Sequence, residues 1–263
     1  MNKPNNLKNQ DEVLVDIILP NYNKGEFLEE TINSVILQTY KNWKLYIIDD
    51  CSKDNSIEII NKFSNLKNIT VIKLNKNKGP AFCRNYAIRN SRSKYISFID
   101  SDDTWFSNKL EKQISFMKEN NYTFTYTDYT PFFESDKKKK FKKKTILRDY
   151  FNYETFIRNS SINTTTMIIK RSILGTQRFR KVKLMEDYLF KCQLLKKGNI
   201  ANKVSESLAY YRILDKSRSS KKLKNIYWLW YINKNFNKLG ILSNLISIFS
   251  ISINSIKKYG GIK

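Results

Sequence analysis

The chain has 263 residues, of which 41% are hydrophobic, and this is enough to bury one large α/β core or two small ones. Lysine and arginine total 48 against 24 acidic residues, so the formal net charge of +24 favours contacts with anionic lipids, nucleic acids or anionic substrates. Three cysteines, an odd number, argue against a disulfide framework and for reduced thiols in a cytoplasmic protein.

The N-terminal half predicts alternating strands and helices. Residues 1–12 are polar and lack the apolar segment of a secretory signal, so we expect a disordered start. Residues 13–19 are mostly apolar and predict a strand buried on both faces, which the segment 20–23 ends. Apolar residues at helical spacing over residues 26–37 predict a helix, and residues 43–48 predict the second strand.

The same alternation continues through residue 99. A helix over residues 54–63 precedes a third strand over residues 69–72, and a further helix opens at Pro80, where the missing N–H costs nothing. Residues 93–99 then predict a fourth strand. Short loops between alternating strands and helices predict a mostly parallel, doubly wound α/β sheet, whose ligand crevice lies at the carboxyl ends of its strands.

Polar and acidic side chains cluster where these strands end. They are Asn21 and Tyr22 after the first strand, Asp49 and Asp50 after the second, and Asp100, Asp102 and Asp103 after the fourth. An acidic turn that caps the helix starting near Ser107 would explain the last cluster alone, but three strand ends converging on one edge favour a binding site. Because the chain has no histidine, the natural counter-ion is a hard divalent cation, Mg²⁺ or Mn²⁺, shared with a phosphate-bearing substrate.

The second half of the chain is less regular. The pattern predicts a helix over residues 110–120, a short strand over 122–126, a lysine-rich loop or hairpin over 136–144, a strand over 164–169, a helix entered through Glu186 and Asp187 and ended at Gly198, and a strand over 209–214. No internal repeat is present in the sequence.

Residues 221–263 form a tail rich in aromatic and aliphatic side chains. Its apolar part, residues 241–256, is interrupted by asparagine and serine and is shorter than the ~20 residues that a bilayer crossing requires. Two interpretations remain open. The tail forms amphipathic helices on an anionic membrane surface, with help from the lysines of residues 137–144, or it packs against the main domain or a homodimer partner.

Five ordered motifs together resemble family 2 glycosyltransferases of the GT-A fold, and in particular the bacterial enzymes that build lipopolysaccharide, capsule and exopolysaccharide. The motifs are the strand end at residues 20–23, the strand end at 47–52, the segment 77–85, the acids within 98–103, and Glu186-Asp187. The resemblance covers residues 15–215, and five motifs in order are far more specific than any one of them.

The resemblance implies a binding site for the nucleotide of a sugar donor. Tyr22, with Pro20, resembles the segment whose aromatic ring stacks on the base, and Asp50, with Asp49, resembles the carboxylate that accepts a hydrogen bond from a uracil-type base. Arg84 resembles the arginine near the base or diphosphate, where a planar guanidinium pairs with oxyanions. Without the resemblance, Tyr22 is interpreted as a core residue at a strand end and Arg84 as one partner of a surface salt bridge.

Asp100 and Asp102 match the DxD motif of that family. The resemblance implies that these carboxylates bind the ribose and hold a divalent cation, which bridges the diphosphate and neutralises charge on the leaving nucleotide. Asp103 is implied to support these ligands. Trp105 is expected either to line the sugar pocket or to pack in the core.

Glu186 and Asp187 resemble the ED motif, whose aspartate is the general base. This residue would remove the proton of the acceptor hydroxyl as its oxygen attacks the anomeric carbon opposite the diphosphate, so that the sugar is inverted. The alternative is that both acids only decorate a helix N-terminus, where negative charge is favourable.

The chain departs from the family pattern in one place. Family members often carry a histidine soon after the tyrosine-arginine pair, and here Leu214 or Asp215 stands near that place. A third metal ligand would have to come from Asp215 or water, or phosphates would complete the metal site. Arg212 and Ser219 remain as candidates for contact with the diphosphate or the acceptor.

We therefore expect residues 13–220 to form a GT-A domain that moves a sugar from a nucleotide-diphosphate donor, UDP-type favoured, to a lipid-linked or polysaccharide acceptor at the cytoplasmic membrane face. A sugar-phosphate nucleotidyltransferase is the second interpretation, but residues 20–25 lack the glycine-rich loop that cradles a triphosphate. A non-enzymatic basic module that binds membrane or nucleic acid is the third, although no nucleic-acid motif accompanies the lysines. The pattern leaves open the sugar, the base and the acceptor.

Overall fold

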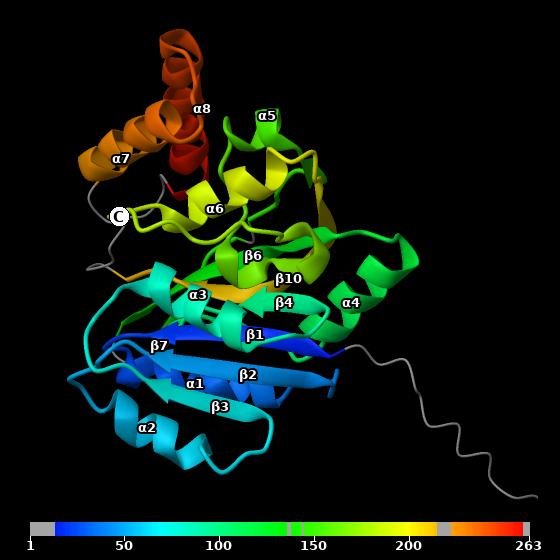
Figure 1. Ribbon diagram of the computed structural model, residues 1–263, viewed down its shortest axis with the longest axis vertical. Coiled ribbons are helices and arrows are strands. Elements are labelled where there is room, and N and C mark those ends of the chain that lie inside the picture. Colours follow the sequence, from blue (N-terminus) through cyan, green and yellow to red (C-terminus); the bar gives the residue numbers. More distant parts are fainter. Residues whose placement is uncertain (1–13, 136–137, 144, 215–221, 260–263) are drawn as a thin grey trace, which may run out of the picture.

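The computed structural model describes residues 14–135, 138–143, 145–214 and 222–259 (Figure 1). The expected disordered start and Ser219 lie outside these residues, as does Asp215.

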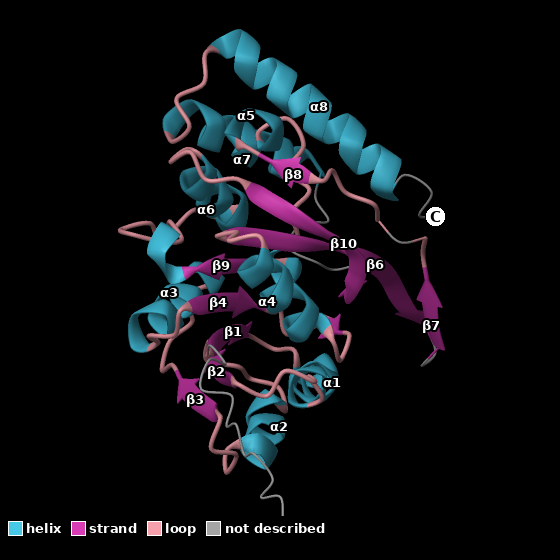
Figure 2. Ribbon diagram, turned by 90° about the vertical axis from the view of Figure 1, so that its right-hand side faces the viewer, coloured by secondary structure: helices cyan, strands magenta, loops and turns pink. Residues whose placement is uncertain are grey.

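The N-terminal half forms the predicted parallel sheet. Its strands are β1 (Val15–Asn21), β2 (Trp43–Asp49), β3 (Ile69–Lys73) and β4 (Tyr95–Phe98), and their order is β3-β2-β1-β4 with every pair parallel. Helices α1 (Gly25–Ile36) and α2 (Ser56–Phe63) cover one face of this sheet, and α3 (Pro80–Asn90) covers the other (Figure 2). The carboxyl ends of β1, β2 and β4 therefore meet at one edge, as the alternating pattern predicted.

The second half extends the same sheet with mixed pairing. The remaining elements of the domain are β5 (Thr104–Trp105), α4 (Lys109–Glu119), β6 (Phe124–Ser135), β7 (Lys138–Phe141), β8 (Tyr150–Phe151), α5 (Tyr153–Phe156), the 3₁₀ helices Thr164–Thr166 and Arg171–Ile173, β9 (Ile168–Lys170), α6 (Glu186–Leu195) and β10 (Ala201–Arg212). β9 runs antiparallel to both β4 and β6, whereas β10 is parallel to β6. The predicted α/β class is confirmed, but the complete sheet is mixed and not mostly parallel.

One predicted strand is shorter than expected. Residues 164–166 form a 3₁₀ turn, and strand β9 begins only at Ile168. Side chains cause this turn, because the Asn163 amide oxygen accepts a hydrogen bond from the Thr165 N–H and the Thr166 hydroxyl donates to the Asn163 carbonyl. Asparagine and threonine compete with sheet pairing in this way. The turn brings Thr164 beside Asp187 and Thr165 beside Asp103.

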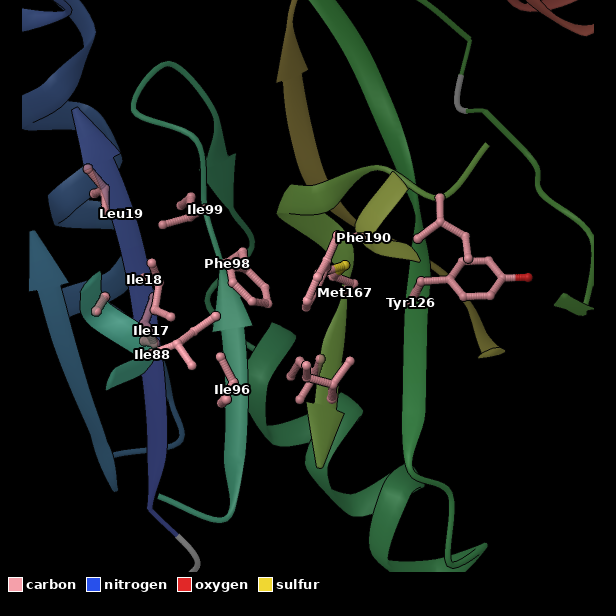
Figure 3. Packing of buried hydrophobic residues seen from close by; sticks show 14 of the residues in the cluster. Ile17, Ile18, Leu19, Ile88, Ile96, Phe98, Ile99, Tyr126, Met167 and Phe190 are labelled. Atoms are coloured by element: carbon pink, nitrogen blue, oxygen red, sulfur yellow. The ribbon is translucent and has the colours of Figure 1, made fainter. Parts of the chain in front are cut away.

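The hydrophobic core lies on both faces of the central strands (Figure 3). Five of its residues are fully buried: Ile17 and Ile18 of β1, Phe98 of β4, Met167 just before β9, and Phe190 of α6. The Phe179 and Phe190 rings stack with centroids 3.9 Å apart, and the Phe98 ring meets both of them edge-on. This aromatic cluster fixes α6 against the sheet, so the N-terminus of α6 lies near the carboxyl edge.

The C-terminal tail folds into two helices, α7 (Lys222–Asn235) and α8 (Ile241–Tyr259), as expected for residues 221–263. A buried amide joins them to the domain, because Asn233 accepts from the Tyr188 hydroxyl at 2.9 Å and donates to Asn244 at 3.1 Å and to Ser247 at 2.9 Å. None of the described helices combines the length and the apolar composition needed to cross a bilayer. One face of the helix pair thus packs on α6, while Leu242 and Phe249 point outward and are exposed.

Candidate active site

The ends of β1 and β2 are tied together by a buried polar cluster. The Asp49 carboxylate accepts hydrogen bonds from the Asn21 amide at 2.8 Å, the Ser52 hydroxyl at 2.6 Å and the Ser52 N–H at 3.0 Å. The Asn21 amide oxygen is buried and has no hydrogen-bond partner in the part of the chain that the structure describes. Tyr22 follows and is 46% exposed, so it is not a core residue, and Pro20 lies inside β1 opposite Ile48.

Asp50 braces the loop that precedes α3. Its two carboxylate oxygens accept hydrogen bonds from the backbone N–H groups of Lys78 and Gly79, each at 2.7 Å. Gly79 adopts φ +84°, a left-handed conformation that costs little without a Cβ. A role for Asp50 at the nucleotide base stays a prediction, and the structure adds a second task, which is to hold the loop that aims α3 at the site.

Arg84 lies at the centre of the site and is buried, so the alternative of a surface salt bridge does not hold. Its Nη2 is 2.7 Å from Asp100 Oδ1, and its Nη1 is 3.4 Å from Glu186 Oε1. The Phe179 ring covers the guanidinium at 5.2 Å. Burial disfavours the charge on Arg84, but Asp100 and Glu186 outweigh burial and raise the pKa of the guanidinium. One buried cation therefore joins the DxD segment to the ED segment.

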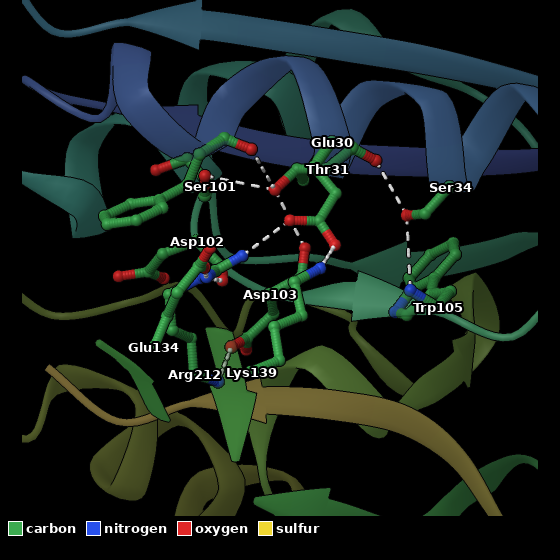
Figure 4. A network of polar contacts seen from close by, with 11 residues as sticks. Glu30, Thr31, Ser34, Ser101, Asp102, Asp103, Trp105, Glu134, Lys139 and Arg212 are labelled. Atoms are coloured by element: carbon green, nitrogen blue, oxygen red, sulfur yellow. Dashed lines mark hydrogen bonds and ion pairs between the residues drawn. The ribbon is translucent and has the colours of Figure 1, made fainter. Parts of the chain in front are cut away.

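The two last acids of the DxD segment point in different directions (Figure 4). The Asp102 carboxylate forms an ion pair with Lys24 at 2.8 Å. The Asp103 carboxylate turns inward, where it accepts from the Thr165 hydroxyl and from the Arg212 N–H at 3.0 Å. Burial and the neighbouring Asp102 raise the pKa of Asp103 well above its ordinary value. Asp103 thus holds the acidic loop to Thr165 and Arg212, and its role in supporting metal ligands stays a prediction.

Arg212 and Trp105 have packing partners in place of the expected substrate contacts. The Arg212 side chain is 1% exposed, pairs with Glu30 at 2.7 Å and with Glu134, and donates from Nε to the Asp102 carbonyl. Two aromatic rings contact its guanidinium, with the Phe27 centroid at 4.4 Å and the Phe132 centroid at 4.5 Å. We therefore correct the expectation that Arg212 faces a diphosphate: its guanidinium is committed to α1 and β6.

Trp105 is also buried, and its indole N–H donates to the Thr165 carbonyl at 2.9 Å. Of the two roles expected for Trp105, the structure shows packing. The Lys109 ammonium lies 4.1 Å from the centroid of the ring, and burial lowers the pKa of Lys109 well below its ordinary value. This arrangement supports β5, which follows the acidic loop.

Asp187 lies in the first turn of α6, which begins at Glu186. Met185, the residue before the ED pair, adopts φ +63°, a strained conformation for a non-glycine residue and one that is concentrated at functional sites. Asp187 Oδ2 accepts from the Lys191 ammonium at 2.8 Å and from the Thr164 hydroxyl at 3.2 Å. Burial raises the pKa of Asp187, but Lys191 and Arg84 outweigh it and hold this pKa well below the ordinary value. Asp187 is therefore ionised at neutral pH.

Sequence reasoning missed four side-chain partners of the acids: Lys24, Thr164, Thr165 and Lys191. The spacing of Lys191, four residues after Asp187 on one helix, is a signal that the sequence contained. Lys24 and Thr165 gave no such signal, because they meet Asp102 and Asp103 only through the tertiary fold.

The acidic edge has the donor set that a hard divalent cation needs in company with phosphates. Among the described residues, no group of three or more histidine, cysteine or carboxylate side chains is arranged so that it could hold a metal ion by itself. Asp100 and Asp102 nevertheless offer two carboxylates, and Mg²⁺ is commonly held by one or two carboxylates together with substrate phosphates. Burial and Asp100 raise the pKa of Asp102, even though Lys24 lowers it, so a nearby cation would favour the ionised form.

Comparison with known proteins places the chain in a family. The model of glycosyl transferase family 2 matches residues 16–189, so the chain belongs to this family and is a glycosyltransferase. It is 34% identical over 249 residues to the UDP-Glc:alpha-D-GlcNAc-diphosphoundecaprenol beta-1,3-glucosyltransferase WfgD of Escherichia coli, with 92% of this chain and 95% of WfgD covered. The predicted family is thereby confirmed.

Solved structures share the fold. S. aureus TarS 1–349 in complex with UDP-GlcNAc gives a TM-score of 0.69 at 19% identity over 92% of this chain and 72% of that chain. The mannosyltransferase PcManGT from Pyrobaculum calidifontis, in complex with GDP-Man and Mn²⁺, gives 0.67 at 12% identity over 95% and 75%. These similarities confirm the predicted GT-A fold.

The position of Arg84 yields a testable prediction. Arg84→Met leaves two acids without their buried counter-charge, and loss of one partner from a buried ion pair typically costs about 3–5 kcal/mol. We expect the free energy of unfolding, measured by urea denaturation, to fall by about 3 kcal/mol and the transfer rate to fall by about 100-fold.

Arg89→Met is the matched control, because Arg89 is exposed on the same helix. An Arg84→Met protein with the stability and the transfer rate of Arg89→Met would contradict the central position given to Arg84.

Proposed function

We propose that this glycosyltransferase inverts the anomeric carbon and uses a divalent cation, Mg²⁺ or Mn²⁺, to transfer a sugar from a nucleoside diphosphate of the UDP type to a lipid-linked or polysaccharide acceptor. The observation that carries the proposal is the Arg84 bridge, which holds Asp100 on one side and Glu186, the neighbour of Asp187, on the other. Arg84 thus fixes Asp100, which we assign to the sugar donor, relative to the segment that carries Asp187, which we assign as the general base.

On the donor side, the exposed Tyr22 ring offers a stacking surface for the base of the nucleotide. We assign Asp100 to the ribose and to the cation, and Asp102 to the cation, and we expect Lys24 to turn from Asp102 to a phosphate when the donor binds. A bound divalent cation would neutralise charge on the diphosphate as it leaves. Of the two solved structures that share this fold, TarS is in complex with UDP-GlcNAc and PcManGT with GDP-Man and Mn²⁺.

The chemical step assigns the proton to Asp187. The carboxylate of Asp187 takes the proton from the acceptor hydroxyl, and the electron pair of that oxygen forms the new bond to the anomeric carbon. The bond between the anomeric carbon and the diphosphate oxygen breaks, and its electrons leave with the nucleoside diphosphate. Attack from the side opposite the leaving group inverts the carbon in one displacement. Lys191 and Arg84 keep the pKa of Asp187 low, so its carboxylate is ionised at neutral pH and has no proton of its own to lose before it accepts one.

The acceptor is inferred from a relative of nearly the same length. WfgD, by its name, glucosylates GlcNAc carried on diphosphoundecaprenol, which is a lipid-linked diphosphate. We propose an acceptor of this class in cell-envelope glycan synthesis, and hence a place for the enzyme at the inner face of the cytoplasmic membrane.

Asp187→Asn tests the base. We expect its transfer rate to fall by about 100- to 10,000-fold, since the amide cannot accept the proton. Binding of UDP with Mn²⁺, followed by thermal shift, should persist in Asp187→Asn and should be lost in Asp102→Ala.

Glu58→Gln, at an exposed acid on α2, is the control for a general effect of charge. Wild-type transfer by purified Asp187→Asn protein would contradict the mechanism.

The exposed face of α7 and α8 supports contact with an anionic membrane. Apolar side chains on α8, such as Leu242 and Phe249, are exposed, and the exposed Lys257 stands near the end of the helix. Each lysine near an anionic surface contributes about 1 kcal/mol. The opposite face is fixed to α6 through Asn233. Packing on the domain and membrane contact are therefore compatible, because they use opposite faces of the same helices.

Flotation with phosphatidylglycerol vesicles tests this surface. We expect the wild-type chain to float with the vesicles and the double variant Leu242→Lys/Phe249→Lys to remain unbound. Substitution is preferable to truncation, because removing α7 would also remove the partner of Tyr188.

Leu37→Lys, at an exposed apolar residue on the opposite part of the fold, should float like wild type. Absence of lipid-dependent flotation, or a dimer in sedimentation that the double variant abolishes, would instead favour a second copy of the chain as the occupant of this face.

A further inference from the structure

Lys191 is a buried cation whose donors are all directed at the start of the ED segment. Its ammonium lies 2.6 Å from the Ile162 carbonyl oxygen, 2.8 Å from Asp187 Oδ2 and 3.2 Å from the Thr164 hydroxyl. An ammonium has three N–H donors, and these three oxygens use all of them. The Lys191 side chain therefore has a fixed position despite its length.

The ion pair between Lys191 and Asp187 is asymmetric with respect to solvent. The Lys191 side chain is 3% exposed, whereas the Asp187 side chain is 38% exposed. The cation thus lies behind the carboxylate, and the carboxylate lies at the surface of the site. Both side-chain donors, Lys191 and Thr164, reach the same oxygen, Oδ2. The other oxygen, Oδ1, receives neither of these two side-chain donors.

The geometry points to Lys191 as the positioning residue of the general base: its ammonium, together with the Thr164 hydroxyl, anchors Asp187 Oδ2 so that Oδ1 receives the proton of the acceptor hydroxyl. This inference rests on the proposed function, in which Asp187 is the base. Lys191 does not touch the substrate, and it acts only through Asp187.

The other charges around Asp187 come from three elements. Arg84 of α3 adds a second positive charge, and Glu186 of α6 lies 3.4 Å from Arg84. Lys258 of α8 contacts the Ser161 hydroxyl on the far side of Lys191. Burial and the repulsion from Lys191 lower the pKa of Lys258 to about 8. Lys191 is thus the cation in direct contact with Asp187, and it is the one that most lowers the pKa of this acid.

The decisive experiment is the pH dependence of the transfer rate. A carboxyl whose pKa is lowered keeps its charge as the pH falls, so wild-type kcat should stay level through pH 5. In Lys191→Met the neighbouring cation is lost, so burial raises the pKa of Asp187. Asp187 then becomes protonated at a higher pH, and kcat should decline as the pH falls below about 6. At pH 7.5 we expect kcat to fall by about 10- to 100-fold with the donor KM unchanged.

Three further variants separate positioning from a general structural effect. Lys191→Arg keeps the charge and should restore much of the wild-type pH profile. Thr164→Val removes the second donor to Oδ2 and should lower kcat by about 3- to 10-fold without moving the pH profile as far. Lys197→Met, at an exposed lysine just beyond α6, is the matched control and should behave as wild type. If Lys191→Met does not fold, the pH profiles and kcat values of Thr164→Val and Lys191→Arg test the positioning role in its place.

Combination with Asp187→Asn distinguishes this inference from the proposed function. If Lys191 acts through Asp187, adding Lys191→Met to Asp187→Asn should cost less than 3-fold more in kcat. A pH profile of Lys191→Met parallel to that of wild type, or a further loss of about 100-fold in the double variant, would overturn the inference and leave the base assignment intact. An active Asp187→Asn protein would instead overturn the base assignment itself.

Discussion

The ion pairs of one buried arginine organise this molecule. Arg84 contacts Asp100 at 2.7 Å and Glu186 at 3.4 Å, although these acids are 86 residues apart in the chain. A buried guanidinium without counter-charges would be costly, and so would either acid without the guanidinium. The folded chain must therefore bring α3, the end of β4 and the start of α6 together. This constraint places the expected donor ligands and the expected base on opposite sides of one cation.

The remaining charges of the site follow the same physical rule. Asp103 is buried and receives hydrogen bonds from Thr165 and Arg212, and Arg212 in turn is held by Glu30 and Glu134. Asp103 and Arg212 are therefore engaged in contacts within the protein and are not directed at a substrate. The side chains left facing solvent at the edge, such as Tyr22 and part of Asp187, are the ones that the proposed chemistry uses. Buried support and exposed function are thus divided between neighbouring residues.

Local patterns were sufficient to predict the parallel half of the sheet and the edge where its acids gather. The alternation from β1 to β4 depends on periodicity and short loops, and the acids follow strand ends directly in the sequence. The turn at residues 164–166 was missed because side-chain bonds of Asn163 and Thr166 override the strand tendency of threonine. The partners of Arg212 were missed because Glu30 lies 182 residues away, and no local pattern records such a contact.

In the proposed mechanism the sugar is transferred in a single displacement, with Asp187 on one side of the anomeric carbon and the diphosphate on the other. The most direct test is the configuration of the product, determined by NMR from the coupling constant of the anomeric proton after transfer from a nucleotide sugar of known configuration. An α-linked donor should give a β-linked product. An α-linked product would show retention and would contradict the arrangement of base and donor around Arg84.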